Sequence, residues 1–136
     1  MSLEKVKALM EEAGWGTLAT SDGENVGCRP MGGWAWMGAE LWCATGSASD
    51  KIAQLRKVPY AEYCFATRDG RHVRIAGPCT VSTDEPDKRT LYDAVPALKN
   101  HIPDPAAPEY VVIRMTPRRI RLMETAGMSY QDVAPQ

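Results

Sequence analysis

The sequence lacks an excess of charge of either sign, with 16 lysines and arginines against 17 aspartates and glutamates in 136 residues. A surface that attracts nucleic acid or membranes by bulk electrostatics is therefore not expected. No apolar run approaches the roughly 20 residues that a membrane-spanning helix needs. The first residues mix both charges and contain no apolar segment of the kind found in signal peptides. We expect a cytoplasmic protein without nucleic-acid or membrane partners.

Cysteine pairs and catalytic signatures are missing as well. Four cysteines lie far apart in strand-like segments, without a Cys-x-x-Cys pair or a neighbouring histidine: Cys28, Cys43, Cys64 and Cys79. Neither a disulfide nor a metal site is predicted, and buried reduced thiols are expected, because a free cysteine behaves as a small hydrophobic residue. The chain has no Ser-His-Asp set, no carboxylate-pair signature and no Gly-x-Gly-x-x-Gly sequence. We therefore assign no catalytic residue.

Short strand-like runs joined by tight turns make up most of the chain. Apolar residues repeat at helical spacing over residues 3–13, and Gly14 is expected to end that helix. Two further helical regions are expected over residues 51–58 and 84–97. Strands are expected over residues 15–21, 26–37, 40–45, 60–67, 71–82, 110–115 and 117–124, the last two forming a hairpin.

These elements favour a single domain over residues 1–136. Strands that follow one another through turns such as Asp22-Gly23 argue against parallel β-α-β winding. We predict a mainly β (α+β) fold, an antiparallel barrel of six to seven strands with peripheral helices. The four tryptophans are expected in the barrel core and a dimer interface, with Trp34 or Trp36 beside a ring ligand as the alternative. His101, in a proline-rich connector, is expected to be solvated.

The run over residues 26–37 contains residues that a regular central strand does not tolerate. Pro30 lacks the N–H that a sheet needs, and Gly32-Gly33 offers no side chains for packing. This pattern predicts a bulge, a sheet edge or a place where another molecule approaches the backbone closely.

The segment from Thr45 to Lys51 leads from an expected strand into an expected helix through small and hydroxyl residues. Free backbone N–H groups, hydroxyls and a lysine at the positive end of a helix suit a phosphate. Arg29, in a strand-like run, is placed to add a second cation. The alternative is an ordinary capping box, with Ser47 as the N-cap and Asp50 three residues later.

In order and spacing, the run Gly16-Thr17-Leu18-Ala19-Thr20, the Asp22-Gly23 turn, Arg29 and residues 45–51 resemble the pyridoxamine 5′-phosphate oxidase-like family, in particular its small general-stress-protein branch. The resemblance covers residues 6–124 and implies an FMN-binding split barrel. It implies that Arg29, Ser49 and Lys51 hold the flavin phosphate, with Asp50 standing where the family has an arginine. The flavin ring would lie against a further set of residues, in which His72 replaces a family glutamine: Pro30, Met31, Gly32, Ala44, Thr45 and His72.

The resemblance also implies a function. We expect a homodimeric FMN-dependent oxidoreductase that acts on a small substrate or electron donor. The carboxy-terminal extension that closes over the vitamin substrate in true pyridoxamine-phosphate oxidases is not recognisable after residue 124, so vitamin B6 synthesis is not expected. One alternative is a non-catalytic flavin-binding, sensor or electron-carrier module. Another keeps the fold but binds a deazaflavin or haem.

Overall fold

The computed structural model describes residues 2–136. Three α-helices, a short 3₁₀ helix (η1) and nine strands follow one another along the chain. Their bounds are α1 (Ser2–Ala13), β1 (Gly16–Ser21), β2 (Val26–Met31), β3 (Trp34–Met37), β4 (Glu40–Gly46), α2 (Asp50–Lys57), β5 (Tyr60–Ala66), β6 (His72–Ser82), α3 (Glu85–Ala94), η1 (Pro96–Asn100), β7 (Tyr110–Met115), β8 (Arg119–Met123) and β9 (Gln131–Val133).

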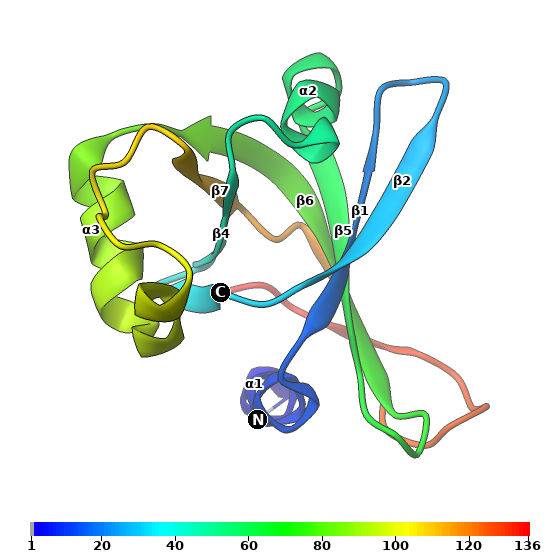
Figure 1. Cartoon of the computed structure of the whole chain (residues 1–136). Helices are drawn as coiled ribbons and strands as arrows, with labels where there is room; N and C mark the ends of the chain where they lie inside the picture. Colours follow the sequence, from blue (N-terminus) through cyan, green and yellow to red (C-terminus); the bar gives the residue numbers. More distant parts are fainter. Residues whose placement is uncertain (1) are drawn as a thin grey trace.

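All strands of the described chain belong to one curled antiparallel sheet, in the order β2-β1-β5-β6-β7-β4-β3 (Figure 1). β8 pairs with the first half of β6 and with β9. The predicted antiparallel barrel with peripheral helices is confirmed, with nine strands instead of six or seven. α1 packs against β5, α2 against β1 and β6, and α3 against β7 and β4. No helix within residues 2–136 is both long and apolar enough to cross a membrane.

The expected hairpin of the last two long strands does not form. β7 pairs with β4 and with the second half of β6, whereas β8 pairs with the first half of β6. The chain passes from β7 to β8 directly over Gly77, where an added Cβ would lie 2.0 Å from the carbonyl oxygen of Thr116. The Thr116 N–H donates to Pro78 O at 2.9 Å. Only glycine leaves room for this crossing, which lets β6 pair with β8 on its first half and with β7 on its second half.

The expected strand over residues 26–37 is divided at Gly32-Gly33. Gly33 has a φ of +65°, a conformation that favours glycine. Its carbonyl accepts a hydrogen bond from Ala44 N at 3.0 Å. The chain therefore turns out of the β1–β2 pair and starts again as β3, which pairs with β4.

The interior contains two hydrophobic clusters. The larger one fills the barrel between α1, α2 and the central strands, and includes Tyr63, Phe65 and Ile75. The smaller one lies under α3 and η1 and consists of Trp42, Leu91, Tyr92, Leu98, Tyr110 and Val112. Cys43 and Cys79 are buried, as expected, and burial raises the pKa of each thiol to about 12. Cys28 departs from the expectation, because its β2 position leaves it exposed.

Candidate functional site

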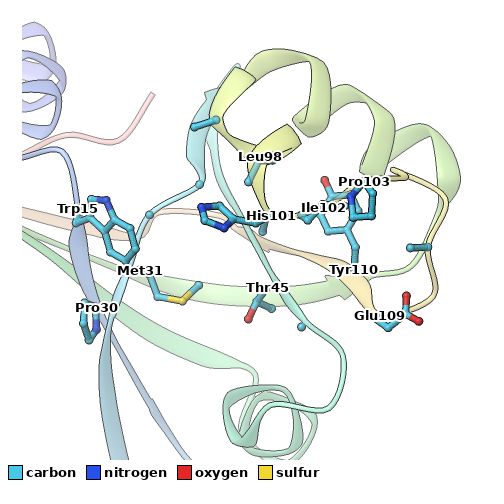
Figure 2. A pocket seen from close by; sticks show the side chains of 16 residues that line it. Trp15, Pro30, Met31, Thr45, Leu98, His101, Ile102, Pro103, Glu109 and Tyr110 are labelled. Atoms are coloured by element: carbon cyan, nitrogen blue, oxygen red, sulfur yellow. The ribbon is translucent and has the colours of Figure 1, made fainter.

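A pocket of about 750 Å³ lies between the barrel strands and the segment that joins α3 to β7 (Figure 2). One side is formed by Trp15, which precedes β1, and by the ends of β2 and β4, and the other by residues 97–110. Most of the lining side chains are apolar. The complete lining is Trp15, Pro30, Met31, Gly32, Gly33, Ala44, Thr45, Gly46, Ala97, Leu98, His101, Ile102, Pro103, Ala107, Glu109 and Tyr110.

Gly32 and Gly33, directly after β2, line the pocket with backbone atoms because they have no side chains. An added Cβ at Gly32 would lie 3.0 Å from the Trp15 ring, and one at Gly33 would lie 3.0 Å from Leu98. Trp15 is 65% exposed and faces the pocket, while Leu98 approaches from the opposite side. Within the chain, the side chains of Trp15 and Leu98 come close to this backbone, and the approach of another molecule stays a prediction.

A buried lysine lies beside the pocket. Lys51, in the first turn of α2, is only 9% exposed, and its Nζ donates to the Thr45 hydroxyl at 2.8 Å. Burial lowers the pKa of Lys51 below its ordinary value, and the nearby Arg29 guanidinium lowers it further. An ammonium group has three donors, so two remain for a ligand after the bond to Thr45.

Arg29 folds back along β2 instead of pairing with an acid. Its Nη1 donates to Thr20 Oγ1 at 2.7 Å and to the Leu18 carbonyl at 3.2 Å. Its guanidinium lies over Gly27, where an added Cβ would be 2.7 Å from Nη2. The Thr20 hydroxyl in turn donates to Gln54 of α2. Between residues 2 and 136, no carboxylate forms an ion pair with Arg29 or Lys51.

The start of α2 differs from the capping box considered above. The N-cap residue is Ser49, and Ser47 lies two residues before it. No side chain caps the helix, because Ser49 Oγ donates to the Gly46 carbonyl at 2.9 Å and does not accept from the helix. The Ser47–Asp50 capping box is therefore wrong, and the positive end of α2 lies beside the two cations with its first N–H groups uncapped by side chains.

Thr45 connects the cationic cluster to the pocket. It lines the pocket together with four other residues expected at the flavin ring: Pro30, Met31, Gly32 and Ala44. Arg29, Ser49 and Lys51, expected at the phosphate, lie outside the lining. Lys51 contacts Thr45 directly, and Arg29 is near enough to Lys51 to lower its pKa.

His72 lies away from this constellation in the described chain. One ring nitrogen is 3.0 Å from the Gly70 carbonyl and the other is 2.6 Å from the Tyr130 hydroxyl. Neither partner lines the pocket. The expected core placement holds for Trp34, Trp36 and Trp42, which lie in or against the two hydrophobic clusters, whereas neither Trp34 nor Trp36 lines the pocket. Trp34 and Trp36 point their indole N–H groups at Gly14 O and Met10 S, and Trp15 is the one that reaches the pocket.

Sequence reasoning missed the second wall of the pocket. His101 is exposed, as expected, but it lines the pocket together with Leu98 and Ile102. The prolines around it gave no periodic signal, and only the path of the chain from α3 to β7 brings it to the strands. Thr20, which accepts a hydrogen bond from Arg29, and Gln54, which accepts one from Thr20, were likewise not identifiable from spacing. No group of three His, Cys, Asp or Glu residues in the described part of the chain is arranged for a metal ion.

Comparisons with known proteins agree with this architecture. A family model described as pyridoxamine 5′-phosphate oxidase matches residues 2–124. A NimC/NimA family protein from Clostridium acetobutylicum superimposes with a TM-score of 0.82 at 19% identity, covering 95% of this chain and 89% of its own. General Stress Protein 26 from Bacillus anthracis gives 0.78 at 21% identity, with coverages of 98% and 100%.

A pyridoxamine 5′-phosphate oxidase-related, FMN binding protein from Nostoc punctiforme gives a TM-score of 0.73 at 16% identity, covering 98% of this chain and 96% of its own. At such identities the solved structures show the fold alone. No curated protein matches the chain significantly. The family match covers most of the sequence and confirms the resemblance noted from the residues: this chain belongs to the pyridoxamine 5′-phosphate oxidase family.

Proposed function

We propose that the chain binds FMN, with the phosphate at Arg29 and Lys51 and the ring in the adjoining pocket, and that it is an oxidoreductase for a small substrate. The observation that carries this proposal is the pair of neighbouring cations, one of them buried, for which the chain between residues 2 and 136 supplies no carboxylate partner. Two like charges without a counter-ion are costly in a protein interior. A phosphate dianion would compensate them.

The donor set fits FMN in both chemistry and layout. FMN carries a dianion at one end and a flat, largely apolar ring at the other. Thr45 belongs both to the cationic cluster and to the pocket, so the two ends of one ligand would meet matching surroundings. Ser49 and the first N–H groups of α2 would add donors to the phosphate.

When bound, the flavin supplies the redox chemistry. The chain's own residues bind and orient it. The backbone over Pro30, Met31 and Gly32 and the β4 residues Ala44 and Thr45 would lie along the ring, and Trp15 would shield one side of it from water. The name of the Nostoc punctiforme relative, an FMN binding protein, is consistent with this assignment.

We further propose that the protein works as a homodimer in the cytoplasm. A strongly exposed Trp15 at the pocket supports a partner surface there. Four free cysteines, two of them buried as thiols, suit a reducing compartment.

The proposal is tested by the visible absorption spectrum of the purified protein with and without added FMN. We expect bound flavin with a shifted, structured band, and Arg29→Ala should weaken FMN about ten- to a hundredfold while leaving riboflavin nearly unchanged. Arg119→Ala is the matched control, because Arg119 is exposed on β8 and its nearest carboxylate, Asp132, is 3.8 Å away. Equal losses for FMN and riboflavin would contradict a phosphate role.

Anaerobic addition of NADH or NADPH then separates an enzyme from a flavin carrier. Bleaching of the bound flavin followed by reoxidation with a small acceptor is expected for an oxidoreductase. A flavin that stays oxidised with both donors would favour the non-catalytic binding module.

A further inference from the structure

The second wall of the pocket is a fixed surface and not a loose loop. Residues 96–110 supply half of the lining, and α3 holds them at two backbone carbonyls. Lys88 Nζ donates to Ala107 O at 2.8 Å, and the Tyr92 hydroxyl donates to Ile102 O at 2.9 Å. The Tyr110 hydroxyl completes the attachment by donating to Lys88 O at 2.8 Å. Lys88 is itself only 4% exposed.

The chemistry of this wall is apolar with a single imidazole. Leu98, Ile102 and Pro103 cover most of it, and its titratable side chains besides Tyr110 are His101 and Glu109. Figure 2 shows the His101 ring projecting from the end of η1 toward Met31 and Trp15 on the opposite side. No hydrogen bond joins this imidazole to another residue of the described chain. Its ring nitrogens are therefore available to form a hydrogen bond with a molecule in the pocket.

We propose that His101 is a specificity-determining residue, whose ring N–H binds the acceptor oxygen of a flat, uncharged carbonyl compound lying against this wall. The inference rests on the proposed function, in which the flavin ring lies along the strand side of the same pocket. A cavity of about 750 Å³ lies in the upper part of the range of roughly 300–1,000 Å³ for small-molecule sites, which favours room for a second molecule.

Flatness and neutrality of this molecule follow from the lining. The exposed Trp15 ring on the side facing His101 favours a planar group, because an aromatic ring stacks well on a flat neighbour. A charged group would lose its hydration among the apolar side chains, and an anion would also meet the carboxylate of Glu109. A neutral carbonyl needs only one donor, which the imidazole provides.

Three probes separate these requirements on the full-length protein. Benzamide is flat, uncharged and carries a carbonyl, benzoate adds a charge, and cyclohexanecarboxamide keeps the amide but loses the flat ring. Binding is followed by saturation-transfer NMR and by quenching of tryptophan fluorescence, with and without FMN. We expect benzamide to bind most tightly and the other two to bind severalfold more weakly.

The variants identify the residue responsible. His101→Leu removes the donor and should weaken benzamide about two- to tenfold, as expected for one neutral hydrogen bond. His101→Gln keeps an N–H donor and should retain most of the binding. Asn100→Leu is the matched control, because it places the same side chain on η1 at an exposed position outside the lining.

The affinity for FMN is measured on every variant and is expected to stay unchanged. Equal benzamide affinity in His101→Leu and the wild type would overturn the role of His101 while leaving FMN binding intact. A loss of FMN affinity in His101→Leu would also overturn it, because His101 would then contact the cofactor. If the wild-type chain binds no FMN, the proposed function is wrong, whatever the role of His101. Benzamide binding that still depends on His101 would then support the role proposed for that residue.

Discussion

Lys51 is the residue at which stability and ligand binding oppose each other. It is 9% exposed, its pKa is lowered by burial and by Arg29, and its ammonium group donates to the Thr45 hydroxyl. Holding such a cation in the protein without a counter-ion lowers the free energy of unfolding. A bound anion would reverse this effect, so the residue is better explained by its ligand than by the fold.

We predict that Lys51→Met stabilises the ligand-free protein and weakens FMN. Removal of the buried charge should raise the free energy of unfolding by about 1 kcal/mol, a few degrees in Tm. Loss of a charge-assisted contact to phosphate should weaken FMN about ten- to a hundredfold, and riboflavin much less. Thermal melts and spectral titrations check both parts, and a lowered Tm without FMN would contradict the first.

The stabilisation should depend on pH in a defined direction. Because the pKa of Lys51 in the folded protein lies below its ordinary value of 10.5, the folded state releases this proton first as pH rises. The cost of the charge is fully present at neutral pH and disappears as pH rises through the folded pKa toward 10.5. The Tm advantage of Lys51→Met should therefore shrink on the alkaline side.

Gly27 offers a way to move Arg29 without replacing it. A Cβ at this position would lie 2.7 Å from Arg29 Nη2, the far end of a flexible side chain. We predict that Gly27→Ala weakens FMN severalfold but changes the free energy of unfolding by less than about 0.5 kcal/mol. Cys28→Ala, at the adjacent exposed position, is the control and should change neither quantity. A large loss of stability in Gly27→Ala would show that the guanidinium cannot move.

At this scale, the sequence identified the residues that lie close together along the chain. Thr45, Ser49 and Lys51 are neighbours in one strand-to-helix turn. The Gly32-Gly33 pair indicates a break in the strand without reference to any distant residue. Trp15 and His101 were not assigned to the pocket because their proximity to Met31 depends on the path of two distant segments. The alternative of an N-cap at Ser47 is wrong because two nearby serines fit the same local pattern, and only the backbone distinguishes them.

Among the elements, β6 determines how the sheet is divided. It pairs with β5 over residues 72–78, with β8 on its first half and with β7 on its second half. Alternation of apolar residues predicted β7 and β8 as strands but not their partners, because the alternation fixes the face of a strand and not its neighbour. The close contact at Gly77, which separates them, has no signature in the pattern.

We predict that Gly77→Ala is severely destabilising. Its Cβ would lie 2.0 Å from a backbone oxygen that is itself held in the sheet crossing, so the strain cannot be relieved by a side-chain rotation. A loss of about 3 kcal/mol or more is expected in urea unfolding, with low yield of folded protein. Gly46→Ala is the control, because the nearest atom to its Cβ is 3.9 Å away. Similar stability in the two variants would contradict the crossing as a packing constraint.

For the whole molecule, the exposed Trp15 beside the pocket predicts association. A side chain of this size that is 65% exposed is unusual unless another molecule covers it. Light scattering at micromolar concentration should give about twice the chain mass of 15.0 kDa. Trp15→Arg should shift the mass toward the monomer. A wild-type monomer that still binds flavin would contradict this prediction.

The division of the interior into two hydrophobic clusters has a consequence for motion. The strand side of the pocket packs on the large barrel cluster, whereas the second wall, formed by residues 96–110, packs on the smaller cluster under α3. A smaller cluster opens at a lower free energy than the whole domain, so amides of η1 and α3 should exchange with solvent before those of β5 and β6. A small molecule held between the two sides would link them, and its binding should appear as slower hydrogen exchange in the wall alone.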